Sequence, residues 1–346
     1  MTTQKPMLRP TTKDLAKTAG VSRATVDRVL NGREGVKQKT VERVNQAIRE
    51  LGFVRNLQAA NLAKSQSYRF IFALPRSGDQ FLEQIVQRIQ EAETVFSADQ
   101  VWCEIQHIDE NNPHSISTFL SSLTKDDVAG VAIMSPETPQ VRDAITRLQE
   151  RGVAALPFIS NQTMMDADWV GIDNRAAGAT AALLLGQCVG RRPGTVMVVA
   201  ESMQSRDSLE RRLGFDKEIN ESFAGIRALP SLETYGNEDR ARAIIAANLA
   251  ANPDIVGIYI MASEARIPLS ILKELDVDPS ILKIAHERTP FTEHALRNKT
   301  LDGVIAQDAG HLVRSAIRRL KGIVDRRETL GSQENIRIEI LLRTNI

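Results

Sequence analysis

Residues 11–32 read TTKDLAKTAGVSRATVDRVLNG, and this stretch predicts two short helices joined by a tight turn. Thr11 and Asp14 stand three residues apart, the spacing of a capping box that begins a helix. Gly20 is suited to end that helix, and Ser22 is a good N-cap for the second one. Two helices around such a turn form a helix-turn-helix, whose second helix enters the major groove of DNA.

The rest of the N-terminal segment fits the same interpretation. A third helix is predicted for residues 39–51, because Val41, Val44, Ile48 and Leu51 lie on one helical face. Residues 1–66 carry 13 Lys and Arg against 5 Asp and Glu, whereas the remaining 280 residues carry 31 against 38. A basic head on a mildly acidic body indicates an anionic partner for the head. Charge alone does not separate nucleic acid from a membrane surface, but the helix pattern favours nucleic acid.

Residues 11–65 resemble the DNA-binding head of the lactose-repressor/galactose-repressor (LacI/GalR) family. They follow the family pattern DVA..AGVS..TVSRVLNG...V...T...V..A...LGY.PN..A..L over about 55 residues without gaps. The resemblance implies a helix-turn-helix domain over residues 1–55 and a hinge helix or linker over residues 56–67. The DNA-binding residues that it implies are Thr12, Ser22, Arg23, Ala24, Thr25, Asp27, Arg28, Asn31, Asn56 and Leu62.

The resemblance also assigns roles within this set. Arg23 and Ala24 stand where family members discriminate bases, and Arg28 would read a guanine edge, for which Arg is the usual bidentate partner. Thr25 matches a position that contacts the DNA backbone. Asp27 departs from the family serine, and it either pairs with a neighbouring arginine or accepts from cytosine N4. A solvated helix charge is the alternative for Arg23.

The hinge has too little apolar surface to hold a helix alone, because short isolated helices are marginal in water. The resemblance implies that it folds only on operator DNA, paired with its dimer mate. Leu62 would then wedge into the minor groove and kink the duplex. The alternative is a plain linker.

From Tyr68 onward, short apolar runs such as RFIFALP and IVGIYIM alternate with amphipathic helical stretches. This alternation predicts parallel sheets covered by helices on both faces. We therefore expect an α/β fold: a small all-α head, and over residues 68–346 a two-lobed core of doubly wound parallel sheets. The core resembles the periplasmic sugar-binding-protein fold, which in the family binds the effector and forms the dimer.

Several classes of protein are disfavoured. No apolar run approaches the ~20 residues of a membrane span, and the N-terminus has no apolar signal-peptide region, so we expect a cytoplasmic protein without a membrane partner. Cys103 and Cys188 are expected to be free thiols. The chain has none of the motifs GxGxxG, GxxxxGK[ST], GxSxG or HExxH, and its five His lack metal-ligand spacing. We expect no enzyme activity, no catalytic residues, no cofactor and no metal.

Ligands of α/β sheets bind at the carboxyl ends of the strands, so polar residues there are candidates for an effector site. The candidates are Arg76, Asp79, Phe81, Ser135, Asn161, Trp169, Asp173, Arg206, Ser263, Glu287 and Gln307. Leu209 stands where relatives carry a sugar-binding arginine, so Arg206 or Arg211 must replace it. Some candidates have alternatives: Asp173 could cap the next helix, and Trp169 could pack in the core instead of stacking on a sugar.

These observations predict a ligand-responsive transcriptional regulator, most simply a repressor. It would bind a near-palindromic operator in double-stranded DNA as a homodimer or tetramer, and sense a small sugar or polyol. The sequence does not fix whether the effector is an inducer or a co-repressor. The alternatives are a solute-binding protein for transport, which leaves the basic head unexplained, and a cytosolic sugar-acting α/β enzyme, which lacks a catalytic motif.

Overall fold

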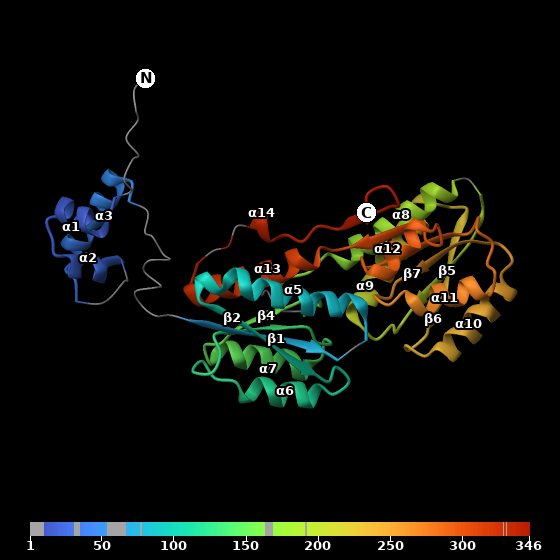
Figure 1. Ribbon diagram of the computed structural model, residues 1–346, viewed down its shortest axis with the longest axis horizontal. Coiled ribbons are helices and arrows are strands. Elements are labelled where there is room, and N and C mark those ends of the chain that lie inside the picture. Colours follow the sequence, from blue (N-terminus) through green and yellow to red (C-terminus); the bar gives the residue numbers. More distant parts are fainter. Residues whose placement is uncertain are drawn as a thin grey trace, which may run out of the picture. The chain divides into compact units, whose positions relative to one another are not determined.

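The computed structural model describes residues 10–30, 35–53, 67–76, 78–162, 169–190, 192–327, 329 and 331–346. It divides the chain into two compact units, Met1–Gln66 and Ser67–Ile346. The elements of both are drawn in Figure 1.

The first unit contains the three predicted helices, α1 (Thr12–Ala19), α2 (Arg23–Leu30) and α3 (Gln38–Leu51). The capping box is present, because the Thr11 hydroxyl accepts from the Asp14 amide and the Asp14 carboxylate accepts from the Thr11 amide. Gly20 ends α1 with a φ of 61°, a conformation that favours glycine. Arg43 of α3 donates to the Ala19 and Gly20 carbonyls and so ties the third helix to the turn.

The first lobe of the second unit is a four-stranded parallel sheet in the order β2-β1-β3-β4. Its strands are β1 (Tyr68–Pro75), β2 (Val101–Ile108), β3 (Gly130–Ile133) and β4 (Ala154–Pro157), with a short 3-10 turn, η1 (Ser97–Asp99), before β2. Helices α5 (Gln80–Phe96) and α13 (Ala309–Asp325) cover one face, and α6 (Pro113–Ser122) and α7 (Pro139–Glu150) cover the other (Figure 1).

The second lobe is a six-stranded sheet in the order β10-β9-β8-β7-β5-β6. Its strands are β5 (Gly194–Ala200), β6 (Ile226–Glu233), β7 (Ile255–Ile260), β8 (Leu282–His286), β9 (Gly303–Ala306) and β10 (Glu339–Leu341). One face packs on α8 (Asn174–Val189) and α9 (Arg206–Ser222), and the other on α10 (Glu238–Ala251), α11 (Arg266–Glu274) and α12 (Pro290–Arg297). The short helix α14 (Gly331–Glu334) precedes β10.

The two-lobed α/β prediction is confirmed, with two corrections. Strand β10 pairs antiparallel with β9, so the second sheet is not purely parallel. The run DWVGID, which we expected to form a strand, contributes only one isolated bridge, between Val170 and Phe158.

The chain passes between the lobes more than once, which places residues from distant parts of the sequence at one boundary. It enters the second lobe before α8 and returns to the first between β9 and α13, whose apolar residues pack with those of β1 and α5. It then crosses again to β10. Carboxyl ends of parallel strands lie at this boundary, because Ser263, after β7, donates to Asp79, after β1.

Candidate functional site

The outer surface of α2 carries the side chains that the sequence places against DNA. Arg23, Ala24, Asp27 and Arg28 are exposed on this helix, whereas Val26 is buried in the core of the unit. Helix packing therefore leaves both arginines available to a partner.

Ser22 and Thr25 interact at the start of α2. The Ser22 hydroxyl accepts from the Thr25 amide at 3.1 Å and bonds to the Thr25 hydroxyl at 2.8 Å. Ser22 thus caps the helix, as its residue type predicts. Thr12 is half-buried in α1, and Asn31, Asn56 and Leu62 lie outside the described residues.

A second candidate site lies where the two lobes of the core meet, at the carboxyl ends of their strands. We call it the interlobe face and define it by Asp79 and Ser160 of the first lobe and Asp207, Ser263 and Glu287 of the second. The Ser263 hydroxyl donates to Asp79, and the Ser160 hydroxyl donates to Asp207 at 3.0 Å. Asp79 also accepts from the Phe81 amide and so caps α5, which fixes its carboxylate between the lobes.

Further bonds hold the lobes together around this face. Arg206 of α9 pairs with Glu137 of the first lobe at 2.8 Å, and Arg266 donates to the Gly78 carbonyl at 2.7 Å. The Phe291 amide donates to the Gln80 side chain at 3.3 Å. Arg206 therefore forms an interlobe ion pair, and its guanidinium also bonds to Glu210 on its own helix.

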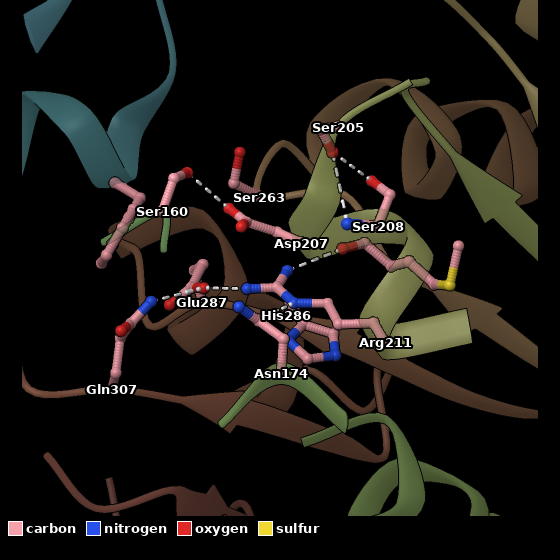
Figure 2. Close-up of polar contacts among 12 residues, drawn as sticks. Ser160, Asn174, Ser205, Asp207, Ser208, Arg211, Ser263, His286, Glu287 and Gln307 are labelled. Carbon is pink, nitrogen blue, oxygen red and sulfur yellow. Dashed lines mark hydrogen bonds and ion pairs between the residues drawn. The ribbon is translucent and has the colours of Figure 1, made fainter. Parts of the chain in front are cut away.

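Arg211 is the central cation of the second lobe, and Figure 2 shows its contacts. Its guanidinium donates to the Asn174 side chain at 2.8 Å, to the Met261 carbonyl at 2.8 Å and to Glu287 at 3.0 Å. Arg211 is only 6% exposed and Glu287 only 1%. The guanidinium thus joins α8 and the ends of β7 and β8 in one buried cluster.

Two glycines bring Arg211 to this place. A Cβ on Gly178 of α8 would lie 1.9 Å from the Arg211 carbonyl oxygen, and a Cβ on Gly214 of α9 would lie 1.9 Å from the Arg175 carbonyl oxygen. Only glycine allows the two helix backbones to approach this closely. The close crossing places the Arg211 side chain against the amino end of α8, where Asn174 is the first residue.

Burial changes the protonation of groups in this cluster. It raises the pKa of Glu287 to about 7, although the Arg211 charge and the bonds from Gln307 and Arg211 oppose the shift. Burial, assisted by the Arg211 charge, lowers the pKa of His286 well below its usual value, so this imidazole is neutral. Its Nε2 lies 2.7 Å from the Tyr259 hydroxyl, and the Tyr259 ring stacks on Phe215. His286 is therefore a neutral core residue that packs next to the Arg211–Glu287 cluster.

Several buried acceptor atoms at the interlobe face have no partner among the described residues. They are Gln162 Oε1, Asp207 Oδ1, Glu287 Oε2 and Gln307 Oε1, and the Ser135 hydroxyl is in the same condition. The amide orientations are fixed, because Gln162 Nε2 donates to the Ser135 carbonyl and Gln307 Nε2 donates to Glu287. Buried polar groups are nearly always hydrogen-bonded, so these atoms indicate a site for a polar molecule with several donors.

Of the predicted effector residues, Asp79, Ser263 and Glu287 belong to the interlobe face, and Gln307 adjoins it by donating to Glu287. The Ser135 carbonyl accepts from the Gln162 side chain. Other candidates lie elsewhere. Phe81 is 3% exposed in the hydrophobic core of the first lobe, because α5 turns its aromatic ring inward, so it is not beside a ligand.

The remaining candidates have local roles or none that the described contacts reveal. Asp173 caps α8, and the Asn161 side chain accepts from the Gln162 amide. Trp169 is half-buried and lies over Gly171, where a Cβ would be 2.3 Å from its ring. Arg76 is exposed.

Asp207 was absent from the predicted effector residues, and Arg211 was predicted only as the alternative to Arg206. The one signal for Arg211 was that Leu209 occupies the position where relatives carry an arginine, so that a nearby arginine must replace it. Asp207 carried no signal that separates it from an ordinary residue of the first turn of a helix.

Comparison with known proteins identifies the domain type of each unit. Residues 70–328 match the model of the periplasmic binding protein domain, and residues 11–56 match that of bacterial regulatory proteins of the lacI family. The chain thus carries a lacI-family DNA-binding domain, and over its core it belongs to the periplasmic binding protein domain family. Within the described residues, none of the helices combines the length and apolar character that a membrane crossing requires. The same residues contain no group of three His, Cys, Asp or Glu placed to hold a metal ion.

Individual relatives are also regulators by name, and they match either much of this chain or its N-terminal unit alone. The chain is 26% identical to the HTH-type transcriptional regulator RegA of Clostridium saccharobutylicum over 64% of this chain and 63% of RegA. It is 54% identical to the maltose regulon regulatory protein MalI of Escherichia coli over 57 residues, 16% of this chain and 17% of MalI. The chain thus matches less than two thirds of the length of either relative.

The core shares its fold with GanP, a glucose-galactose binding protein from Geobacillus stearothermophilus. The TM-score is 0.70 at 16% identity, over 81% of this chain and 99% of GanP.

Proposed function

We propose that this LacI-family protein is a cytoplasmic transcriptional repressor that binds a near-palindromic operator as a homodimer and responds to a small polyhydroxylated effector. The observation that carries the proposal is the buried Arg211–Glu287–Gln307 cluster, whose remaining acceptor atoms point to a polar ligand. It occurs in a chain whose other unit is a LacI-type helix-turn-helix.

The DNA-binding part rests on the exposed face of α2 and on charge. Arg23 and Arg28 are exposed on the helix that would enter the major groove, and residues 1–66 carry a net charge of +8. Base reading by Arg28 and phosphate attraction by the whole unit are separate contributions, because phosphate contacts position a protein and base contacts give specificity.

The effector part rests on hydrogen-bonding capacity. The buried acceptor oxygens could accept hydrogen bonds from adjacent hydroxyl groups of a ligand, because hydroxyl groups donate as well as accept. These oxygens belong to Glu287, Gln307, Gln162 and Asp207. The name of GanP records glucose and galactose as ligands of a protein with this core fold. A sugar or polyol is therefore the ligand class that the site fits in hydrogen-bonding terms.

The coupling of the two functions would come from lobe closure. The interlobe bonds, such as Ser160–Asp207 and Arg206–Glu137, hold the lobes in one arrangement, and a ligand between them would favour it. An effector that prefers one arrangement must change operator affinity, and operator DNA must change effector affinity by the same factor.

The test uses the full chain. Selection from random duplex DNA should yield a near-palindromic motif, and a panel of sugars and polyols should then be screened for changes in affinity for that motif. Recovery of no motif would contradict the DNA-binding proposal, and a motif whose binding no compound alters would contradict the effector proposal.

A serine variant provides the matched control. Ser135→Ala should leave operator binding unchanged but raise the effector concentration needed for the response by about tenfold, since its hydroxyl is buried without a partner. Ser315→Ala removes another buried hydroxyl, on α13, and should change neither property.

A further inference from the structure

Four carboxylates, two from each lobe, follow the carboxyl ends of parallel strands, and one of them, Asp79, belongs to the interlobe face. Asp79 follows β1 and Glu110 follows β2 in the first lobe, and Glu201 follows β5 and Glu264 follows β7 in the second. The Asp79–Ser263 bond shows that the two pairs come from facing edges.

These carboxylates repel one another. The pKa of Glu201 is raised by burial and then by the charges of Asp79, Glu110 and Glu264. The pKa of Glu110 is raised by burial and then by Asp109 and Asp79. Arg266 pairs with Glu264 at 2.5 Å, but no ion pair joins Glu110 or Glu201 to any residue that the structure describes. The arrangement of the lobes in the structure therefore concentrates negative charge.

The buried acceptors provide an independent observation. Glu287 Oε2 and Gln307 Oε1 are unpartnered on side chains that are 1% and 3% exposed, and the bonds of the other atoms fix their direction. Asp79 lies within electrostatic reach of Glu287, since its charge raises the pKa of that residue. The acceptors thus belong to the same negative region as the carboxylates.

We infer that the effector carries a protonated amine on its polyhydroxylated frame, as an amino sugar or amino polyol does. An ammonium group offers three donors and no acceptor, which complements a face where unpartnered acceptors and carboxylates predominate. Its charge would offset the repulsion between the lobes, so it would bind the closed arrangement better than the open one. This inference rests on the proposed effector function.

A metal ion is a poorer match for the same charge. No group of three His, Cys, Asp or Glu among the described residues is placed to hold one. The fixed amide oxygen of Gln307 lies beside Glu287, and its position suits a hydrogen-bond donor on an organic molecule.

The test measures binding of matched compounds to the full chain by calorimetry and thermal shift at about pH 7, where a typical aliphatic α-amine is still largely protonated. The panel contains glucosamine, galactosamine and mannosamine, each beside its N-acetyl derivative and its parent hexose, with glucose 6-phosphate and Mg²⁺ as further arms. We expect at least one amine to bind tenfold or more tightly than both of its neutral counterparts, and to alter operator binding.

The outcomes separate this inference from the proposed function. If a neutral hexose binds as well as its amine and alters operator binding, the effector proposal stands and the amine inference is wrong. Preference for the phosphate or for Mg²⁺ alone also overturns the inference. If no compound binds or changes operator affinity, both the effector proposal and the amine inference are wrong.

A pair of variants tests the carboxylates directly. Glu110→Gln with Glu201→Gln should weaken binding of the preferred amine at least fivefold while leaving its N-acetyl derivative unaffected. The control, Glu150→Gln with Glu221→Gln, removes two exposed charges at the ends of α7 and α9 and should affect neither. Equal effects of the two pairs would show that only the overall charge matters.

Discussion

Replacing Glu287 by Ala should destabilise the core strongly, because this carboxylate is the anionic partner of a buried cation. Its Oε1 accepts from Arg211 at 3.0 Å and from Gln307 at 3.1 Å. Removing one partner of a buried ion pair costs about 3–5 kcal/mol, since the remaining charge is left uncompensated. Arg211 keeps its bonds to Asn174 and Met261, so we expect a loss of ~4 kcal/mol.

The loss is measurable as a melting temperature. In domains of about 150–250 residues, each kcal/mol shifts the midpoint by about 2–4 °C, so a loss of ~4 kcal/mol should lower the core transition by roughly 8–16 °C. Circular dichroism and differential scanning fluorimetry of the full chain would record it. Glu221→Ala, which removes an exposed carboxylate of α9, serves as the control.

The variant Glu287→Gln isolates the charge, because the amide keeps an acceptor for Arg211 but does not titrate. Burial raises the pKa of Glu287 from 4.5 to about 7, so the folded protein holds this proton more tightly than the unfolded chain. The associated stability is fully present below pH 4.5 and is lost as the pH rises through 7. The advantage of wild type over Glu287→Gln should therefore shrink between about pH 5 and 8.

Two results would refute this reasoning. If Glu287→Ala melts within about 2 °C of wild type, the cluster does not support the core. If the difference between wild type and Glu287→Gln is independent of pH, the carboxylate is ionised throughout and burial does not control its protonation.

Operator affinity should fall steeply with salt, because a head of charge +8 releases counterions on binding; a flat salt response would contradict DNA binding. Arg28→Ala should cost about 1–3 kcal/mol on operator and little on random DNA, as fluorescence anisotropy would show, whereas equal losses would make Arg28 a phosphate contact. Leu62→Ala should reduce both operator affinity and DNA bending measured by FRET, and unchanged bending would leave the hinge a plain linker. Gly178→Ala should prevent normal folding of the core, since the added Cβ meets a backbone oxygen at 1.9 Å, while Gly225→Ala meets only ordinary contacts and should melt like wild type.

The head could be predicted in detail because its signals are local. The Thr11–Asp14 box and Gly20 each act within a few residues of their own position, and the structure shows both in their predicted roles. The bonds from Arg43 to the turn join residues more than 20 positions apart, and no short pattern announces them.

Features of the core that depend on contacts between distant residues could not be predicted from the sequence. DWVGID has the composition of a strand, but a strand needs a partner, and only Val170 finds one. The three-residue strand β10 exists because β9 offers it an edge. The strand-end rule found Asp79, Ser263, Glu287 and Gln307, since it needs only the order of strands. The position of the Arg211 side chain depends on the crossing of α8 and α9, which is a tertiary contact that no local pattern predicts.

The division of bonds between the lobes explains how a small ligand could control this core. Arg211 is bonded to α8 and to the ends of β7 and β8, all in the second lobe, so that half of the site is rigid without any ligand. The first lobe adds single hydrogen bonds and half-buried ion pairs, such as Ser160–Asp207 and Arg206–Glu137, each worth about 1 kcal/mol. A closed arrangement held by so few weak contacts lies within a few kcal/mol of an open one. A ligand needs about 5.5 kcal/mol of differential binding to reverse a 1:99 population, which several hydrogen bonds to buried acceptors could supply.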